Sequence, residues 1–144
     1  MGHEETPIDP EEYVLRRIHK SNYKRLLPIP VATAAFRPND NDDDGISLYR
    51  ECMTSPATLA SSARKPASEY VIARIKVADV LGLGLSLKLS ESTGDLPGHV
   101  VIPEVNWGGY NSNAREKEKM KEIGKNLAEL ASKDVLTDFT AQEQ

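Results

Sequence analysis

YVIARIKV, residues 70–77, is the most regular stretch of the chain, and it decides the fold. Every second residue from Val71 to Val77 is apolar and falls on one face, while Arg74 and Lys76 fall on the other. An apolar–polar period of two is typical of a half-buried β-strand. The chain is therefore expected to build a sheet with one face against a hydrophobic core.

Shorter segments of the same character lie on both sides of this strand. Two of them, residues 31–36 and 46–49, precede it, and two more, residues 85–89 and 99–102, follow it. Pro103 ends the last segment or places it at a sheet edge, because proline cannot donate to a ladder. These patterns predict about four to five short strands in a mostly antiparallel sheet.

Helices are predicted at both ends of the chain. Asp9 suits the N-cap position of a helix, and Pro10 suits the first helical position. Glu12 follows the cap by three residues, as in a capping box. Together they predict a helix over residues 10–20. From about Ser112 to Lys133, apolar residues recur at spacings of three and four, which predicts a long second helix. We expect its apolar stripe to pack on the sheet, although a homodimer through this helix is an alternative.

The overall expectation is an α+β protein with a single domain over residues 10–133. Residues 1–9 are expected to form a flexible tail and residues 134–144 a frayed one. A chain of 144 residues is long enough to bury a core of its own.

Composition sets the expected compartment and class of partner. Cys52 is the single cysteine, the first residues are polar, and no apolar run approaches the length that crosses a bilayer. We therefore expect a cytoplasmic protein without a membrane partner. The formal net charge of −4 argues against a general nucleic-acid binder.

DNDDDGISLYRE, residues 40–51, matches the calcium-loop pattern at every defined position. Asp40, Asp42, Asp44 and Glu51 are the candidate metal ligands. The segment before them, residues 28–38, has prolines at both ends and is typical of a strand, whereas a calcium loop needs an incoming helix. An exposed turn is the favoured interpretation, and calcium binding is kept as an alternative.

A basic cluster near the N-terminus is the candidate binding surface, since cations with interleaved aromatic rings suit a phosphate or an acidic surface. A charged, solvated helix face is the simpler alternative. Its residues are Arg16, Arg17, Lys20, Tyr23, Lys24 and Arg25.

Four residues support a hypothesis of metal-independent catalysis on a nucleic acid or nucleotide. His19 and His99 would act as proton carriers, and Arg16 or Arg50 would hold the phosphate. That chemistry requires the two imidazoles to meet in space, and histidines placed like these are also common as hydrogen-bonded structural residues. Neither the binding hypothesis nor the catalytic hypothesis calls for a cofactor.

Four short segments resemble a group of small stand-alone bacterial proteins to which no activity is assigned. They are RRIH (16–19), AFRP (35–38), DGIS (44–47) and LPGHVVIPE (96–104). The resemblance implies no catalytic residues, and it implies that DGIS belongs to the fold rather than to a cation site. The sequence thus favours a small module that binds an acidic protein or a nucleic-acid phosphate.

Overall fold

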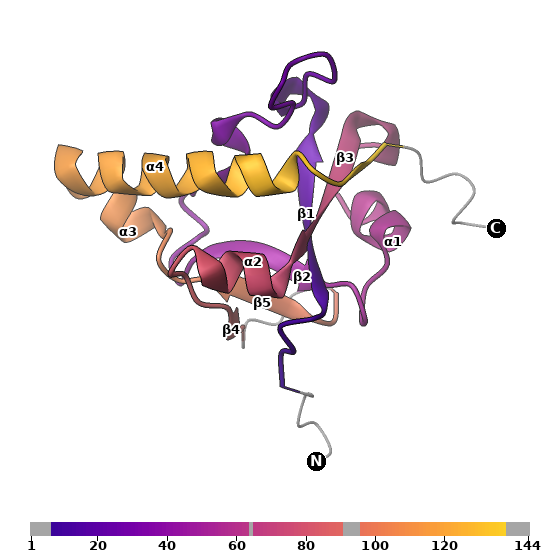
Figure 1. Ribbon diagram of the computed structural model, residues 1–144, viewed down its shortest axis with the longest axis horizontal. Helices are drawn as coiled ribbons and strands as arrows, with labels where there is room; N and C mark the ends of the chain where they lie inside the picture. Colours follow the sequence, from indigo (N-terminus) through magenta and orange to yellow (C-terminus); the bar gives the residue numbers. More distant parts are fainter. Residues whose placement is uncertain (1–6, 64, 91–95, 138–144) are drawn as a thin grey trace.

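The computed structural model describes residues 7–63, 65–90 and 96–137, and these build one antiparallel sheet beside a long helix (Figure 1). The order of its six described strands is β4-β5-β2-β1-β3-β6. The strands are β1 (Tyr13–His19), β2 (Ile46–Arg50), β3 (Tyr70–Lys76), β4 (Lys88–Leu89), β5 (His99–Ile102) and β6 (Val135–Leu136). The helices are α1 (Pro56–Ser61), α2 (Val77–Gly82), α3 (Trp107–Tyr110) and α4 (Ala114–Ala131), with 3-10 turns η1 (Lys20–Asn22), η2 (Thr33–Phe36) and η3 (Ala67–Glu69).

This architecture confirms the predicted α+β class, with an antiparallel sheet and a long C-terminal helix, but the described sheet has six strands rather than the predicted four to five. Asn113 caps α4 by accepting the backbone N–H of Glu116 at 2.9 Å. The apolar stripe of α4 is buried in the chain's own core through residues such as Leu127 and Ala131. A homodimer through this helix stays a prediction.

The N-terminal helix predicted over residues 10–20 is wrong, because most of this segment is strand β1 at the centre of the sheet. The capping-box contact does form, since the Asp9 N–H donates to Glu12 Oε2 at 2.7 Å, but the chain leaves the turn after Glu12. Strand β1 then pairs with β3 over all seven residues. Val14 and Leu15 are both fully buried on opposite faces, as expected for a strand covered on both sides.

Three further boundaries differ from the sequence prediction. Residues 31–36 form a single bridge, Tyr23 to Val31, and then η2, rather than a strand. The strand predicted over residues 85–89 shrinks to β4, and the frayed tail predicted from Asp134 begins with β6. Of the predicted tails, residues 1–6 and 138–144 lie outside the described residues.

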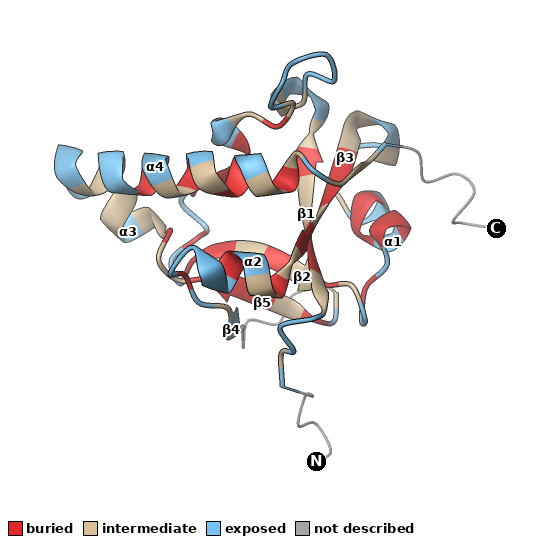
Figure 2. Ribbon diagram, in the orientation of Figure 1, coloured by how far each residue is buried: buried red, intermediate tan, exposed pale blue. Residues whose placement is uncertain are grey.

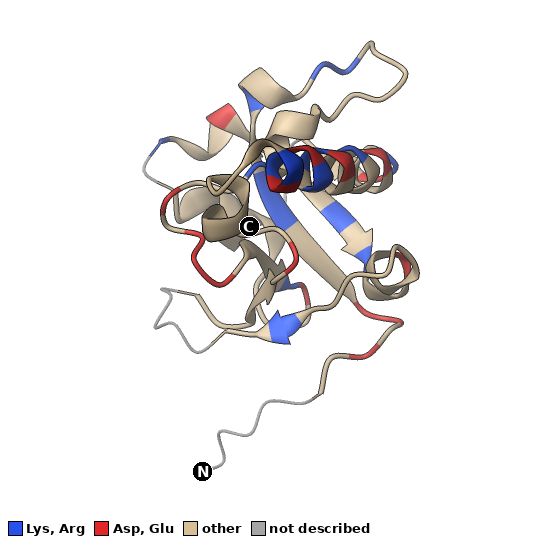
Figure 3. Cartoon of the chain, turned by 90° about the vertical axis from the view of Figure 1, so that its left-hand side faces the viewer, with Lys and Arg blue, Asp and Glu red and all other residues tan. Residues whose placement is uncertain are grey.

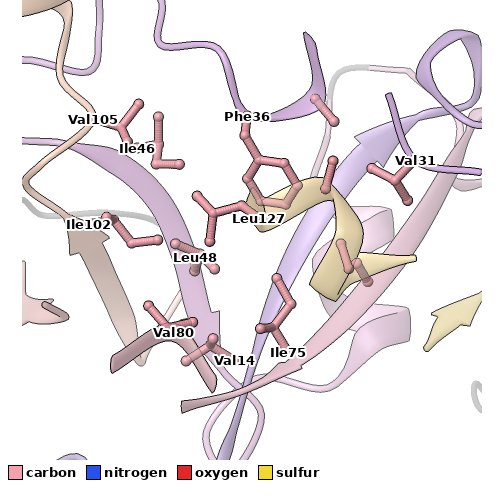
Figure 4. Packing of buried hydrophobic residues seen from close by; sticks show 14 of the residues in the cluster. Val14, Val31, Phe36, Ile46, Leu48, Ile75, Val80, Ile102, Val105 and Leu127 are labelled. Atoms are coloured by element: carbon pink, nitrogen blue, oxygen red, sulfur yellow. The ribbon is translucent and has the colours of Figure 1, made fainter. Parts of the chain in front are cut away.

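Each face of the sheet carries its own hydrophobic cluster. The larger one lies under α4 and η2, where Phe36, Leu48, Ile75 and Leu127 pack together (Figure 4). The smaller one lies on the opposite face beside α1, whose inner side is buried (Figure 2). It contains Leu15, Leu59 and Ile72. The sheet is thus the middle layer between a long helix and a short one.

A charged pair is buried where β2 meets the N-terminal turn. Arg50 is 1% exposed, and its Nε and Nη2 donate to Glu12 Oε1 and Oε2, both at 2.9 Å. The hydrogen bond with Arg50 lowers the pKa of Glu12, and partial burial opposes this effect. The pair fixes the start of β1 to the end of β2.

Within the described ranges 7–63, 65–90 and 96–137, no helix has the length and apolar character that a membrane crossing requires.

Candidate functional site

The predicted basic cluster is divided by the strand geometry of β1. Successive side chains of a strand point to opposite faces, so Arg16 and Arg17 lie on different sides of the sheet. Arg16 donates to the backbone oxygens of Ala35 at 2.8 Å and Ser47 at 2.7 Å, and burial lowers the pKa of its guanidinium while the Asp42 carboxylate opposes this. Its role is to tie η2 to β2.

Arg17 is also occupied within the fold. Its Nη1 donates to the carbonyl of Leu59 at 3.0 Å and to Ser62 Oγ at 2.8 Å, and its guanidinium lies 5.6 Å from the Tyr70 ring centroid. These contacts anchor α1 against the sheet. Arg16 and Arg17 are therefore structural residues in this arrangement rather than free cations.

The other three predicted cations lie together on an exposed loop, residues 20–30, which we call the basic loop. The Tyr23–Val31 bridge closes its base, and the backbone N–H of Lys24 donates to the carbonyl of Pro30 at 2.8 Å. A further turn forms where the N–H of Leu27 donates to Lys24 O at 3.0 Å. The loop projects from the end of β1 (Figure 3). Its charged residues Lys20, Lys24 and Arg25 are exposed.

The tip of the basic loop exposes apolar side chains that the sequence analysis did not single out. Leu26 is 89% exposed, Leu27 53% and Ile29 44%. The sequence carries a signal for this exposure: LLPIP, residues 26–30, is too short and too rich in proline to continue a helix or a ladder. Apolar side chains next to cations on a hydrogen-bonded loop have the composition of a contact surface.

Neither Tyr23, expected in this cluster, nor the nearby Tyr13 presents its ring on the basic loop. Tyr23 is partly buried and packs against the larger core cluster. The Tyr13 ring lies 4.2 Å from the Arg74 guanidinium carbon, at the other end of β1. The basic loop therefore offers cations and aliphatic side chains, without a described ring on which a base could stack.

The two histidines of the catalytic hypothesis are not brought together. His99 lies opposite Tyr49, which lies opposite Leu15, four residues from His19. That register separates the histidine backbones by about 13 Å along the strands and about 10 Å across them. Each imidazole has its own neighbours, Glu69 for His19 at 3.3 Å and Ser47 for His99 at 2.8 Å.

The arginines of that hypothesis lie on the opposite face of the sheet from the histidines. Arg50 is paired with Val14, and Arg16 is two residues from Val14, so both point toward the α4 side. His19 and His99 share the α1 side with Leu15. Paired acid–base chemistry on one phosphate has no support in this geometry.

Ser47 and His99 form a cross-strand hydrogen bond at 2.8 Å, which resembles a nucleophile and base. Burial lowers the pKa of His99, and Asp44 and Asp42 act in the opposite direction. The Tyr49 ring stacks on the imidazole with centroids 5.1 Å apart. Because Ser47 sits inside strand β2 beside this stacked ring, the contact is that of a packed structural pair.

The acidic stretch does not form a calcium cage. Asp42 accepts the N–H of Asn39 at 2.9 Å and is buried, and burial raises its pKa. Strand β2 carries Glu51 away from Asp44, and Glu51 instead accepts from Arg74 at 2.9 Å. No group of three metal-ligating acidic, histidine or cysteine side chains occurs among the residues that the structure describes.

Addition of millimolar calcium is expected to leave the melting temperature unchanged, because Glu51 cannot close a cage from the far end of a strand. Thermal unfolding with calcium chloride, against the same concentration of magnesium chloride, measures the effect. A calcium-specific rise in melting temperature that disappears in Asp44→Asn would contradict this expectation. The magnesium series corrects for general ionic effects.

Comparison of the chain with protein-family models, curated proteins and solved structures finds no match. The candidate site therefore comes from the geometry of the chain itself. Among the described residues, the basic loop is where predicted binding cations and strongly exposed aliphatic side chains coincide.

Proposed function

We propose that the protein is an interaction module that binds an acidic partner protein through the basic loop. The observation that carries the proposal is the position of Leu26, 89% exposed and adjacent to Lys24 and Arg25 on a loop closed by backbone hydrogen bonds. A preformed loop loses little conformational entropy on binding. Aliphatic anchors surrounded by charge are the usual composition of a contact centre with a polar rim.

An acidic protein suits this loop better than a nucleic acid. Base stacking needs exposed rings, whereas Tyr23 is held against the core. Burying an exposed leucine in an apolar pocket is worth about 1.5–3 kcal/mol, and phosphate backbones offer no such pocket. Lys24 and Arg25 would steer the encounter with a carboxylate-rich surface and give it a salt dependence.

A photo-crosslinking residue placed at Leu26 tests the proposal in cells that express the chain natively. We expect a protein adduct whose crosslinked peptide is rich in Asp and Glu, and we expect the Lys24→Glu, Arg25→Glu double variant to lose it. The matched control places the same residue at Leu81, which is 42% exposed on α2. Equal adducts at both positions, or an adduct that survives charge reversal, would refute the proposal.

Replacing Leu26 and Leu27 by serine is expected to leave stability nearly unchanged and to weaken partner binding at least tenfold. Both side chains are exposed, so the free energy of unfolding should move by less than about 0.5 kcal/mol. Leu127→Ser, in the buried core, should by contrast cost several kcal/mol. Urea unfolding measures stability, and titration calorimetry with the crosslinked partner measures binding.

A nucleic-acid phosphate would be favoured as the partner if the protein bound a single-stranded RNA with saturation. That binding would have to be lost in the Lys24→Glu, Arg25→Glu double variant and kept in the serine variant of Leu26 and Leu27. Fluorescence anisotropy at low salt distinguishes these outcomes. In that case the cations rather than the leucines would carry recognition.

A further inference from the structure

A cleft runs between η2, the segment that follows it, α3 and the N-terminal half of α4, away from the basic loop. It has two compartments that share Arg37 and Tyr110, and we call it the Tyr110 cleft. Figure 1 shows α3 beside the start of α4, where these elements meet. The inner compartment measures about 270 Å³ and the outer one about 490 Å³.

The inner compartment is apolar and depends on a glycine in α4. Phe36, Tyr110, Met120 and Gly124 are among the residues that line it. A Cβ at Gly124 would lie 3.4 Å from Thr33 Cγ2, an ordinary contact, so a methyl group fits there and a longer side chain must enter the compartment. An apolar cavity of about 150 Å³ already holds benzene, so this compartment has room for a substituted ring.

The outer compartment adds aromatic and cationic groups. The Trp107 and Tyr110 rings stack with centroids 6.4 Å apart, and the Lys117 ammonium lies 5.3 Å from the Tyr110 centroid. Their local structure is fixed by Asn106, whose side chain accepts the N–H of Gly109 at 2.7 Å and so begins α3. The rings therefore stand on a short but capped turn.

Positive charge predominates around the cleft although the chain as a whole carries −4. Three cations line it, of which Lys121 pairs with Glu118 at 3.6 Å, while Arg37 and Lys117 have no carboxylate partner in the described part of the chain. Asp40 is the one carboxylate among the described lining residues. Cations at the mouth of an apolar pocket favour an anion with an apolar body.

We propose that the Tyr110 cleft binds a small organic anion with an aromatic body. The ring enters the inner compartment against Phe36 and Met120, and the anionic group lies in the outer compartment near Arg37 and Lys117. The rings of Trp107 and Tyr110 contact the portion between them. This site is independent of the proposed partner surface, because the two share no residue.

8-Anilino-1-naphthalenesulfonate is a direct probe of this ligand class, and N-phenyl-1-naphthylamine is its matched control, with the same rings and no charge. We expect the folded protein to bind one sulfonate probe per chain with saturation, and to bind the neutral probe at least tenfold more weakly. Fluorescence titration measures both. Near-ultraviolet circular dichroism in the same samples verifies native packing, because loosened proteins also bind the sulfonate probe.

Three substitutions, with two control variants, locate the bound probe. Arg37→Gln and Lys117→Gln are each expected to weaken sulfonate binding about tenfold or more, since each removes a charge-assisted contact, and to leave the neutral probe unchanged. Gly124→Leu should abolish binding of both probes, whereas Gly124→Ala should preserve it. Lys24→Glu in the basic loop should have no effect on either probe.

Failure of the folded wild-type protein to bind the sulfonate probe would overturn the proposal. So would equal binding of the two probes, or sulfonate binding that is insensitive to both Arg37→Gln and Lys117→Gln. If Gly124→Leu does not fold, the two charge variants still decide the matter, because both replace surface side chains. Unchanged probe binding in a variant that has lost its partner separates this site from the proposed function.

Discussion

Glu12→Gln is expected to lower the free energy of unfolding by about 1.5–3 kcal/mol, the usual contribution of a hydrogen bond to a charged group. Arg50 is 1% exposed and donates two hydrogen bonds to the Glu12 carboxylate, both at 2.9 Å. Glutamine supplies one acceptor oxygen and no charge, so the buried guanidinium of Arg50 loses a charge-assisted hydrogen bond. Urea unfolding at neutral pH measures the loss.

The neighbouring carboxylate provides a matched control. Glu11 is exposed and pairs with Lys76 at 3.0 Å on the surface, so Glu11→Gln should cost less than about 1 kcal/mol. Equal losses in the two variants would show that the buried pair contributes no more than a surface one. The two substitutions change the net charge of the protein by the same amount. A difference between their losses of stability therefore cannot come from net charge.

The same pair predicts a pH dependence of stability. The hydrogen bond from Arg50 holds the pKa of Glu12 below its ordinary value, which is about 4.3 in an unfolded chain. The folded state therefore gains stability above that ordinary value and loses it as the pH falls through the lowered pKa. The difference in stability between wild type and Glu12→Gln should shrink in this acidic window and stay constant above about pH 6.

Gly45→Ala is expected to destabilise the protein by about 3 kcal/mol or more, because backbone strain and a steric clash add at one position. Gly45 has φ +136°, a conformation that residues with a side chain rarely adopt, and a Cβ there would lie 2.5 Å from the Ile102 carbonyl oxygen. The obstacle is the backbone of β5, which pairs with β2 immediately beyond the glycine. The clash cannot be relieved by rotating a side chain.

Two other glycines calibrate this result. Gly82→Ala meets no atom within 4 Å and has no positive φ, so its effect should be small. Gly84→Ala also meets no atom within 4 Å but has φ +85°, so it measures backbone strain alone, about 1 kcal/mol or somewhat more. A loss in Gly45→Ala no larger than that in Gly84→Ala would show that β5 moves aside.

The sequence predicted those elements whose pattern of apolar residues along the chain matches the faces that they bury in the folded structure. Strand β3 was foreseen because its alternation matches a sheet with charged residues on one side, and α4 because its apolar stripe has a single face to bury. Strand β1 was missed because a central strand is apolar on both faces, and Val14, Leu15 and Ile18 match a helical spacing equally well. Its local capping signal was satisfied by a single turn, and pairing with β3 decided the rest.

The candidate sites were predictable only in part for the same reason. The positions of Lys24 and Arg25 on an exposed surface followed from composition, whereas the separation of Arg16 from Arg17 followed from strand geometry that was not foreseen. The Tyr110 cleft joins segments more than seventy residues apart, Arg37 and Tyr110, and no local pattern encodes such a meeting. Site residues from distant segments become visible only when the topology is known.

Strands β4 and β6 at the borders of the described sheet are only two residues long each. A foreign strand that docked on either one would find few free backbone groups to pair with, and β4 also presents the exposed Lys88. The long strand β1 lies inside the sheet between β2 and β3, and β3 pairs with β1 over its whole length and with β6 at Ile72 and Ala73. Border strands this short therefore disfavour edge-to-edge aggregation of this protein.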